Sequence, residues 1–191
     1  MMRMGSWSFY AELGWSLGLP NGPTFSLILT MKNFVFLVLF TIVSWPIVSQ
    51  PIAITFQAAS SQGIIVKELD SLYLSAVHVD SSLAVFKSDV DQEKMHTEYV
   101  KLLQAFGVFL RENNFNWTQK TACFNRIYFN KDGGIDYFVY NFRGKPEEKP
   151  TPEQEKEFNR LLSLFIQDYK IDLKADRPFA QCSPTTYMPK E

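Results

Sequence analysis

Residues 121–143 read TACFNRIYFNKDGGIDYFVYNFR, and this stretch decides the fold class. Its two arms, Thr121–Asn130 and Ile135–Phe142, are rich in Phe, Tyr, Ile and Val and have the period-two character of strands. The segment KDGG at 131–134 lies between them, and glycine permits the positive φ that a tight hairpin turn requires. The stretch therefore predicts a β-hairpin. Both of its faces carry aromatic residues, so we expect one face to pack on helices and the other to be partly covered or exposed.

A long helix is predicted on the N-terminal side of the hairpin. Apolar residues recur three or four positions apart over 95–110, which is the helical period. Asp89 or Asp91 can cap its start, because a carboxylate accepts hydrogen bonds from the amides of the first turn. Asn113-Asn114 can end it, because Asn tolerates the left-handed conformation. A shorter helix is predicted further upstream, with its apolar face at Ile65, Leu69, Leu72, Tyr73 and Ala76.

A third helix is predicted after the hairpin, with an apolar stripe from Phe158 to Tyr169. Thr151 is the expected N-cap, Pro152 takes the first helical position, and Gln154 completes a capping box.

The chain from Pro178 onward reads as an extended segment that pairs with the hairpin, and Pro184 confines this segment to an edge or a bulge. The fold class is therefore α+β, in one small domain over 63–191. Two N-terminal helices come first, followed by the hairpin, a helix and a C-terminal edge strand, which is the order ββαβ.

Composition sets broad limits on the class of protein. A chain of 191 residues fits one domain of ordinary size plus a targeting segment. The hydrophobic fraction of 46% and the aromatic fraction of 15% are enough for a core and argue against global disorder. The formal net charge is −1 and the basic residues are scattered, which argues against nucleic acid as a partner.

The N-terminal part of the chain predicts export. Residues 31–51 read MKNFVFLVLFTIVSWPIVSQP, with a positive charge at Lys32, a long apolar run, the helix breaker Pro46 and the small residue Ser49. This is the order of a secretory signal peptide. We expect cleavage after Ser49 and a secreted or periplasmic location. The alternative is a membrane anchor, although the uninterrupted apolar run is shorter than the about 20 residues that a spanning helix needs.

The segments on either side of the signal peptide (31–49) have separate interpretations. Residues 1–30 look like neither a domain nor a leader, and a start codon assigned too far upstream explains them. Residues 50–62 are expected to form a short tail, either an edge strand or a segment that becomes ordered on docking.

Cys123 and Cys182 are the only cysteines, and both follow the predicted cleavage site. An even number of cysteines in an oxidising compartment favours a disulfide, which would join the hairpin to the C-terminal segment. The alternative is a pair of buried free thiols.

One cluster has residue types that acid–base or nucleophilic catalysis uses, namely His78, Asp80 and Ser82. A small hydrolase is the corresponding hypothesis. The competing interpretation is a turn in which Asp80 caps a helix through structural hydrogen bonds. With two histidines in the chain, no metal site and no cofactor are predicted, and His96 is interpreted as a solvated helix residue.

Four aromatic residues are candidates for a binding surface: Trp117, Tyr137, Tyr140 and Tyr187. A domain this small is not expected to bury them all, and exposed aromatics mark contact with a partner. The alternative is that they complete a second core layer. The sequence thus favours an exported non-enzymatic domain that binds an envelope protein or a glycan through an aromatic hairpin face. The alternatives are the hydrolase and a purely structural domain.

Overall fold

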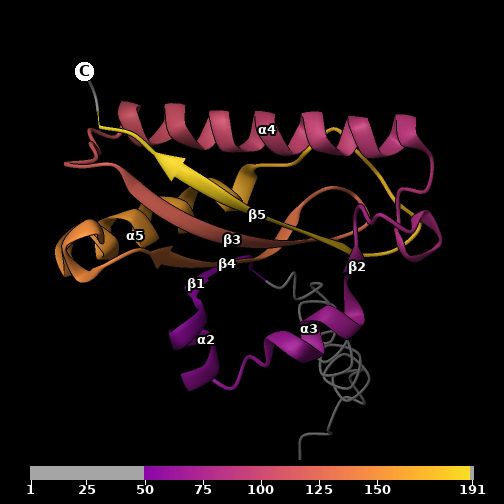
Figure 1. Ribbon diagram of the computed structural model, residues 1–191, viewed down its shortest axis with the longest axis horizontal. Coiled ribbons are helices and arrows are strands. Elements are labelled where there is room, and N and C mark those ends of the chain that lie inside the picture. Colours follow the sequence, from indigo (N-terminus) through magenta and orange to yellow (C-terminus); the bar gives the residue numbers. More distant parts are fainter. Residues whose placement is uncertain (1–49, 190–191) are drawn as a thin grey trace, which may run out of the picture. The chain divides into compact units, whose positions relative to one another are not determined.

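The computed structural model describes residues 50–189 (Figure 1), so the predicted upstream extension and signal peptide lie outside the described residues. The helices and strands are β1 (Ile52–Thr55), α2 (Phe56–Ser61), α3 (Val66–Leu72), β2 (Leu74–Ser75), α4 (Asp89–Glu112), β3 (Thr121–Phe129), β4 (Ile135–Arg143), α5 (Pro152–Asp168) and β5 (Phe179–Tyr187).

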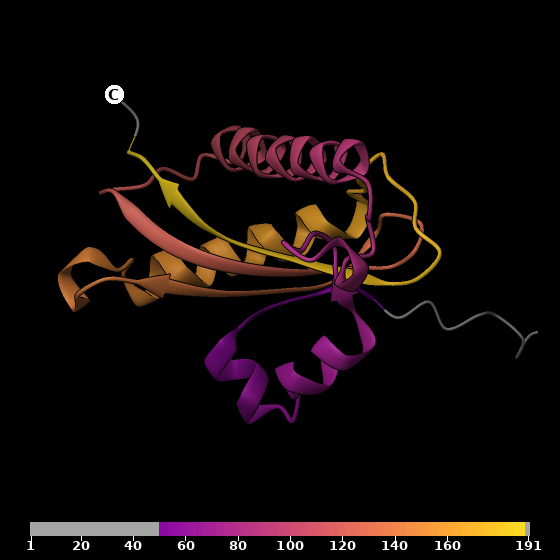
Figure 2. The same ribbon diagram turned by 45° about the vertical axis from the view of Figure 1, so that its right-hand side comes forward.

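The strands form one five-stranded sheet in the order β1-β4-β3-β5-β2. Strand β3 is antiparallel to both β4 and β5, whereas the short strands β1 and β2 run parallel to β4 and β5 at the two edges. Figure 2 shows α4 on one side of the sheet and α2 with α3 on the other. The fold is therefore mixed α+β, as the sequence predicts.

The hairpin turn lies where the KDGG segment predicts it. Gly133 has a φ of 83°, a conformation that favours glycine. Its position also needs the small residue, because a Cβ there would lie 2.5 Å from the backbone oxygen of Ile171. The Ile171 N–H donates to the Gly133 oxygen at 3.1 Å, so the segment that follows α5 packs directly against the turn.

The N-terminal part differs from its prediction. Within residues 50–62, the alternative of a short edge strand is confirmed by β1, which pairs with β4 at the edge of the sheet, whereas helix α2 was not expected. The helix expected to continue to Ala76 ends at Leu72, whose side chain is 68% exposed. The physical reason is a strand pairing that the local pattern does not reveal, in which the Ala76 N–H donates to the Ala180 oxygen.

The long helix α4 is correctly predicted, but its cap is not. The N-cap is Ser88, whose hydroxyl accepts the Asp91 N–H at 3.1 Å, rather than Asp89 or Asp91. At the other end, Asn113 is the C-cap and Asn114 has a φ of 59°, which confirms the predicted stop.

Helix α5 begins with the predicted Thr151 cap, whose hydroxyl accepts the Gln154 N–H at 3.2 Å. The Gln154 side chain, however, donates to the Asn116 oxygen at 3.1 Å instead of completing a capping box. It thereby ties the start of α5 to the loop that follows α4.

Strand β5 lies between β3 and the short edge strand β2. It pairs with β3 from end to end, whereas β2 covers it only at Phe179–Ala180. The backbone oxygen of Ala180 points away from β3 and accepts the N–H of Ala76. Backbone groups of every second residue in a strand point the same way, so the backbone nitrogen of Pro184 also points away from β3. The missing N–H of Pro184 therefore costs no bond to β3, although the edge strand of the sheet on this side is β2 rather than the predicted C-terminal strand.

The two sides of the sheet carry cores of very different size. The larger core lies under α4 and α5 and includes Phe106, Phe138 and Phe158. The smaller core lies under α2 and α3 and includes Leu69, Tyr128, Val139 and Ala180. Among the described helices, none combines the length and hydrophobicity needed to cross a membrane.

Candidate functional site

The predicted catalytic cluster is an exposed turn in the structure. Asp80 caps a 3₁₀ helix, Ser81–Leu83, by accepting the backbone N–H of Ser82 at 3.0 Å and its hydroxyl at 2.7 Å. These two hydrogen bonds from Ser82 lower the pKa of the Asp80 carboxyl. His78 Nδ1 accepts the backbone N–H of Asp80 at 3.0 Å.

This arrangement does not follow the order that a hydrolase requires. A catalytic imidazole takes the proton of the serine, and the carboxylate orients the imidazole. In this turn the Ser82 hydroxyl donates to the carboxylate, and His78 bonds to backbone atoms. The geometry is that of the capping turn that the sequence also allowed.

Three of the four predicted binding aromatics are buried, which contradicts their assignment to an exposed face. Tyr140 is fully buried, and Trp117 and Tyr187 are each 8% exposed. Trp117 stacks on Tyr187 with ring centroids 4.7 Å apart, and both rings pack against Phe158 of α5. The alternative that these residues complete the core is correct for these three. Tyr137 is half-buried on the other side of the sheet.

The two cysteines are both free, so the expected disulfide is absent from this fold. Cys123 pairs with Thr185 across the strands, whereas Cys182 pairs with Arg126, three residues further along β3. Because strand side chains alternate, the two cysteines point to opposite faces of the sheet. Cys123 lies under α4 and α5, where burial raises the pKa of its thiol to about 12, and Cys182 is exposed.

Part of the hairpin surface remains open on the side of α2 and α3. These two helices cover the sheet around Tyr128 and Val139. Strands β3, β4 and β5 extend beyond these two helices on the side of the sheet where the chain ends (Figure 2). We call the uncovered residues the open hairpin face, and all of them are exposed or half-buried: Ala122, Phe124 and Arg126 of β3, Asn141 and Arg143 of β4, and Cys182, Pro184 and Thr186 of β5.

The open hairpin face carries one aromatic ring and two cations. Phe124 is half-buried, supported from α2 by Phe56 at a centroid distance of 6.1 Å. The Arg143 guanidinium lies 6.0 Å from the centre of the Phe124 ring, in the range of a cation–π contact. Arg126 forms an ion pair with Asp70 of α3. The face thus combines apolar surface with positive charge.

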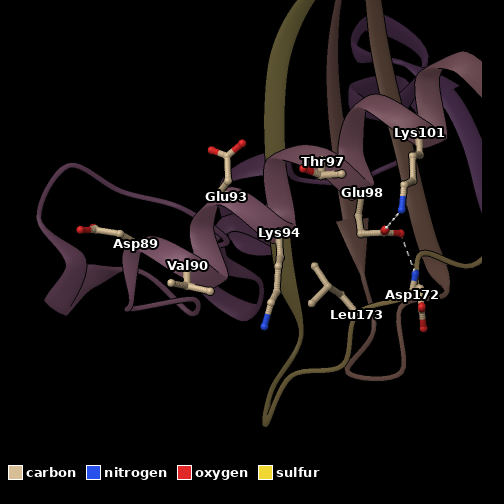
Figure 3. Close-up of a pocket in the computed structure, with 9 residues that line it drawn as sticks. All are labelled: Asp89, Val90, Glu93, Lys94, Thr97, Glu98, Lys101, Asp172 and Leu173. Atoms are coloured by element: carbon tan, nitrogen blue, oxygen red, sulfur yellow. Dashed lines mark hydrogen bonds and ion pairs between the residues drawn. The ribbon is translucent and has the colours of Figure 1, made fainter.

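A groove of about 650 Å³ lies on the opposite side of the domain, between α4 and the segment that follows α5. Figure 3 shows Glu98 pointing between Lys101 and Asp172. The Glu98 carboxylate accepts a hydrogen bond from the Lys101 ammonium at 2.7 Å and another from the Asp172 N–H at 2.9 Å. These hydrogen bonds lower the pKa of the Glu98 carboxyl. Glu98 is 9% exposed, so it acts as a structural tie between the two segments.

The sequence analysis overlooked both Glu98 and the open hairpin face. The face could have been found from the alternation of β3, which places Ala122, Phe124 and Arg126 on one side. Glu98 gave no such signal, because its partner Asp172 is distant in sequence. Within residues 50–189, no group of three His, Cys, Asp or Glu side chains is arranged to hold a metal ion.

No protein family model, curated protein or solved structure matches this chain. The functional interpretation therefore rests on the geometry of the chain itself.

Proposed function

We propose that this chain is an exported, non-enzymatic domain that binds a protein partner through the open hairpin face. The observation that carries the proposal is the half-covered sheet. Helices α4 and α5 bury one side, whereas α2 and α3 leave eight residues of the other side exposed or half-buried and contact Phe124 and Arg126 among them. A sheet surface that exposes an aromatic ring and an arginine has the composition enriched in protein interfaces.

The export part of the proposal is supported by the position of the domain. The described residues begin at Gln50, and β1 begins at Ile52. Cleavage after Ser49 would therefore release the domain with its first strand intact. The leader pattern over 31–49 supplies the second argument.

A protein is favoured over a glycan as the partner by the shape of the contributing residues. Ala122, Pro184 and Thr186 are small or compact and lie side by side on neighbouring strands. Such residues form a broad surface, and specific protein interfaces bury about 800 Å² on each partner.

The export step is tested by the intact mass of the protein purified from its own host. A mass that begins at Gln50 is expected, together with recovery outside the cytoplasm. A mass that begins at Met1 or Met31 would contradict cleavage and turn attention to the membrane-anchor alternative.

The binding step is tested by placing a large charge on the open hairpin face. Ala122→Arg is expected to abolish the native complex in size-exclusion chromatography of host extracts, because Ala122 is exposed and its replacement leaves the core intact. Val108→Arg is the matched control, since Val108 is 42% exposed on α4. Loss of the complex in both variants, or in neither, would argue against this face.

A further inference from the structure

We infer that the partner presents an acidic segment, in which a carboxylate pairs with Arg143 and a neighbouring apolar side chain packs on Phe124. This inference rests on the proposed function and adds the chemistry of the partner.

Charge on the open hairpin face is of one sign. Its eight residues include Arg126 and Arg143 and no Asp or Glu. The rest of the domain is slightly acidic, since removal of residues 1–49 takes away Arg3, Lys32 and Glu12 and changes the formal net charge from −1 to −2. A positive surface on an acidic domain favours a partner of complementary charge.

The two arginines differ in what they already bind. The Asp70 carboxylate pairs with Arg126 and also accepts the hydroxyl of Tyr128 at 3.0 Å, so Arg126 is held within the fold. Arg143 forms no ion pair with any other side chain in the described part of the chain. Its guanidinium is therefore the charge available to an incoming carboxylate, which it can bind with two parallel hydrogen bonds.

Two carboxylates follow Arg143 closely in the sequence, Glu147 and Glu148, and the second is engaged within the fold. Glu148 accepts the backbone N–H of Lys145 at 3.0 Å, in the turn that follows β4. Lys120 and Lys145 flank the same end of the hairpin, and the exposed Glu147 and Glu148 lie in the turn beyond it.

Phe124 provides the apolar half of the site. Its ring is supported below by Phe56 and is flanked across the strands by Asn141 and Pro184. The guanidinium of Arg143 lies over the ring before any partner arrives, so less side-chain freedom is lost on binding. A segment that pairs an acidic residue with an apolar one fits this surface.

The experiment is photo-crosslinking of the full chain, expressed in its own host, with p-benzoylphenylalanine at Ala122. Mass spectrometry then identifies the captured peptide. We expect a segment of another protein with Asp or Glu within a few residues of the crosslink. The same substitution at Val108 on α4 is the control and should not capture that segment.

Two variants of the crosslinking chain test the role of the charge. Arg143→Gln should lower the crosslink yield about tenfold, and Arg143→Lys should restore only part of it, because an ammonium lacks the planar fork of a guanidinium. Arg111→Gln, at an exposed arginine of α4, should leave the yield unchanged. Circular dichroism of each variant confirms that it is folded.

The outcomes separate the two proposals. No crosslink at Ala122 would overturn both of them. A captured protein segment that lacks acidic residues, or a yield unaffected by Arg143→Gln, would overturn the acidic partner and leave the binding face in place. A captured glycan, or a second copy of this chain, would also overturn the acidic protein partner.

Discussion

The two sides of the sheet bury their residues in different ways. On the side of α4 and α5, aromatic rings pack in a continuous cluster around Phe158. On the side of α2 and α3, Leu69 is the only residue of α3 that is buried. Polar contacts hold that helix as well, including the hydrogen bond from Tyr73 to Asp136 at 2.8 Å. The first side therefore buries the larger core, and the second buries a smaller core and leaves part of the sheet exposed.

The largest expected difference between the two sides is in thiol reactivity. Cys182 should react with Ellman's reagent at once, whereas Cys123, which is 1% exposed, should react about a thousandfold more slowly, because it requires unfolding. A Cys182→Ser variant should show only the slow reaction. If neither cysteine reacts before reduction, the two are bonded after all and the strand register is different.

Replacing a buried side chain with Ala should lower the free energy of unfolding more in the core under α4 and α5 than in the core under α2 and α3. Phe158→Ala should lower the free energy of unfolding by about 4 kcal/mol, because Phe158 is fully buried among other rings. Leu69→Ala should cost about 2 kcal/mol, since α3 packs on one side only. Urea denaturation measures both values, and equal losses would show that the two sides contribute alike.

Alkaline pH should destabilise the domain through the groups under α4 and α5. Burial raises the pKa of Cys123 and of Tyr99 to about 12, and it also raises the pKa of Tyr187. These groups are protonated when folded and ionise more readily when unfolded. Their contribution is therefore complete below pH 9.0 and is lost as pH rises towards about 12.

The measurement is the urea midpoint as a function of pH. Each such group contributes a slope of up to about 1.4 kcal/mol per pH unit. Cys123→Ala should remove the part of the decline that begins near pH 9.0, and Cys182→Ala is the matched control. A decline of the same size in the Cys123→Ala variant would contradict the assignment to Cys123.

The smallest expected effect concerns the polar contacts of α3. Tyr73→Phe removes the hydroxyl that donates to Asp136 and should cost about 1 kcal/mol. Hydrogen exchange should become faster in α3 and stay unchanged in α4, because the loss is local. Tyr99→Phe is the comparison on the other side, where the hydroxyl accepts from Ser183 at 2.9 Å. Faster exchange throughout the domain would mean that α3 unfolds together with the main core.

The parts of the fold that were predicted from the sequence are those with a long local pattern. The hairpin, α4 and α5 each repeat their period over nine residues or more. By contrast, β1 has four residues and β2 has two, which is too short for a period to be recognised. Both exist because they pair with distant strands, so the sequence offered β1 only as one of two alternatives and did not indicate β2.

The candidate site was harder to predict for a related reason. Aromatic residues occupy both faces of the hairpin, and the sequence does not state which face the longer helices cover. Tyr140 and Phe124 look alike in the sequence, yet the first is buried under α5 and the second lies on the open hairpin face. The expected disulfide was wrong for the same reason, because register places Cys123 and Cys182 on opposite faces.

The sequence by itself determined the α+β class, the hairpin with its glycine turn, the two long helices and the leader pattern. Each of these depends on residues close together along the chain, where period, caps and turn chemistry act. The tertiary structure alone decided the strand order, the cover on each face and hence which aromatic and charged residues remain exposed. Those properties depend on contacts between residues far apart in the chain, and such contacts are selected by how the whole core packs.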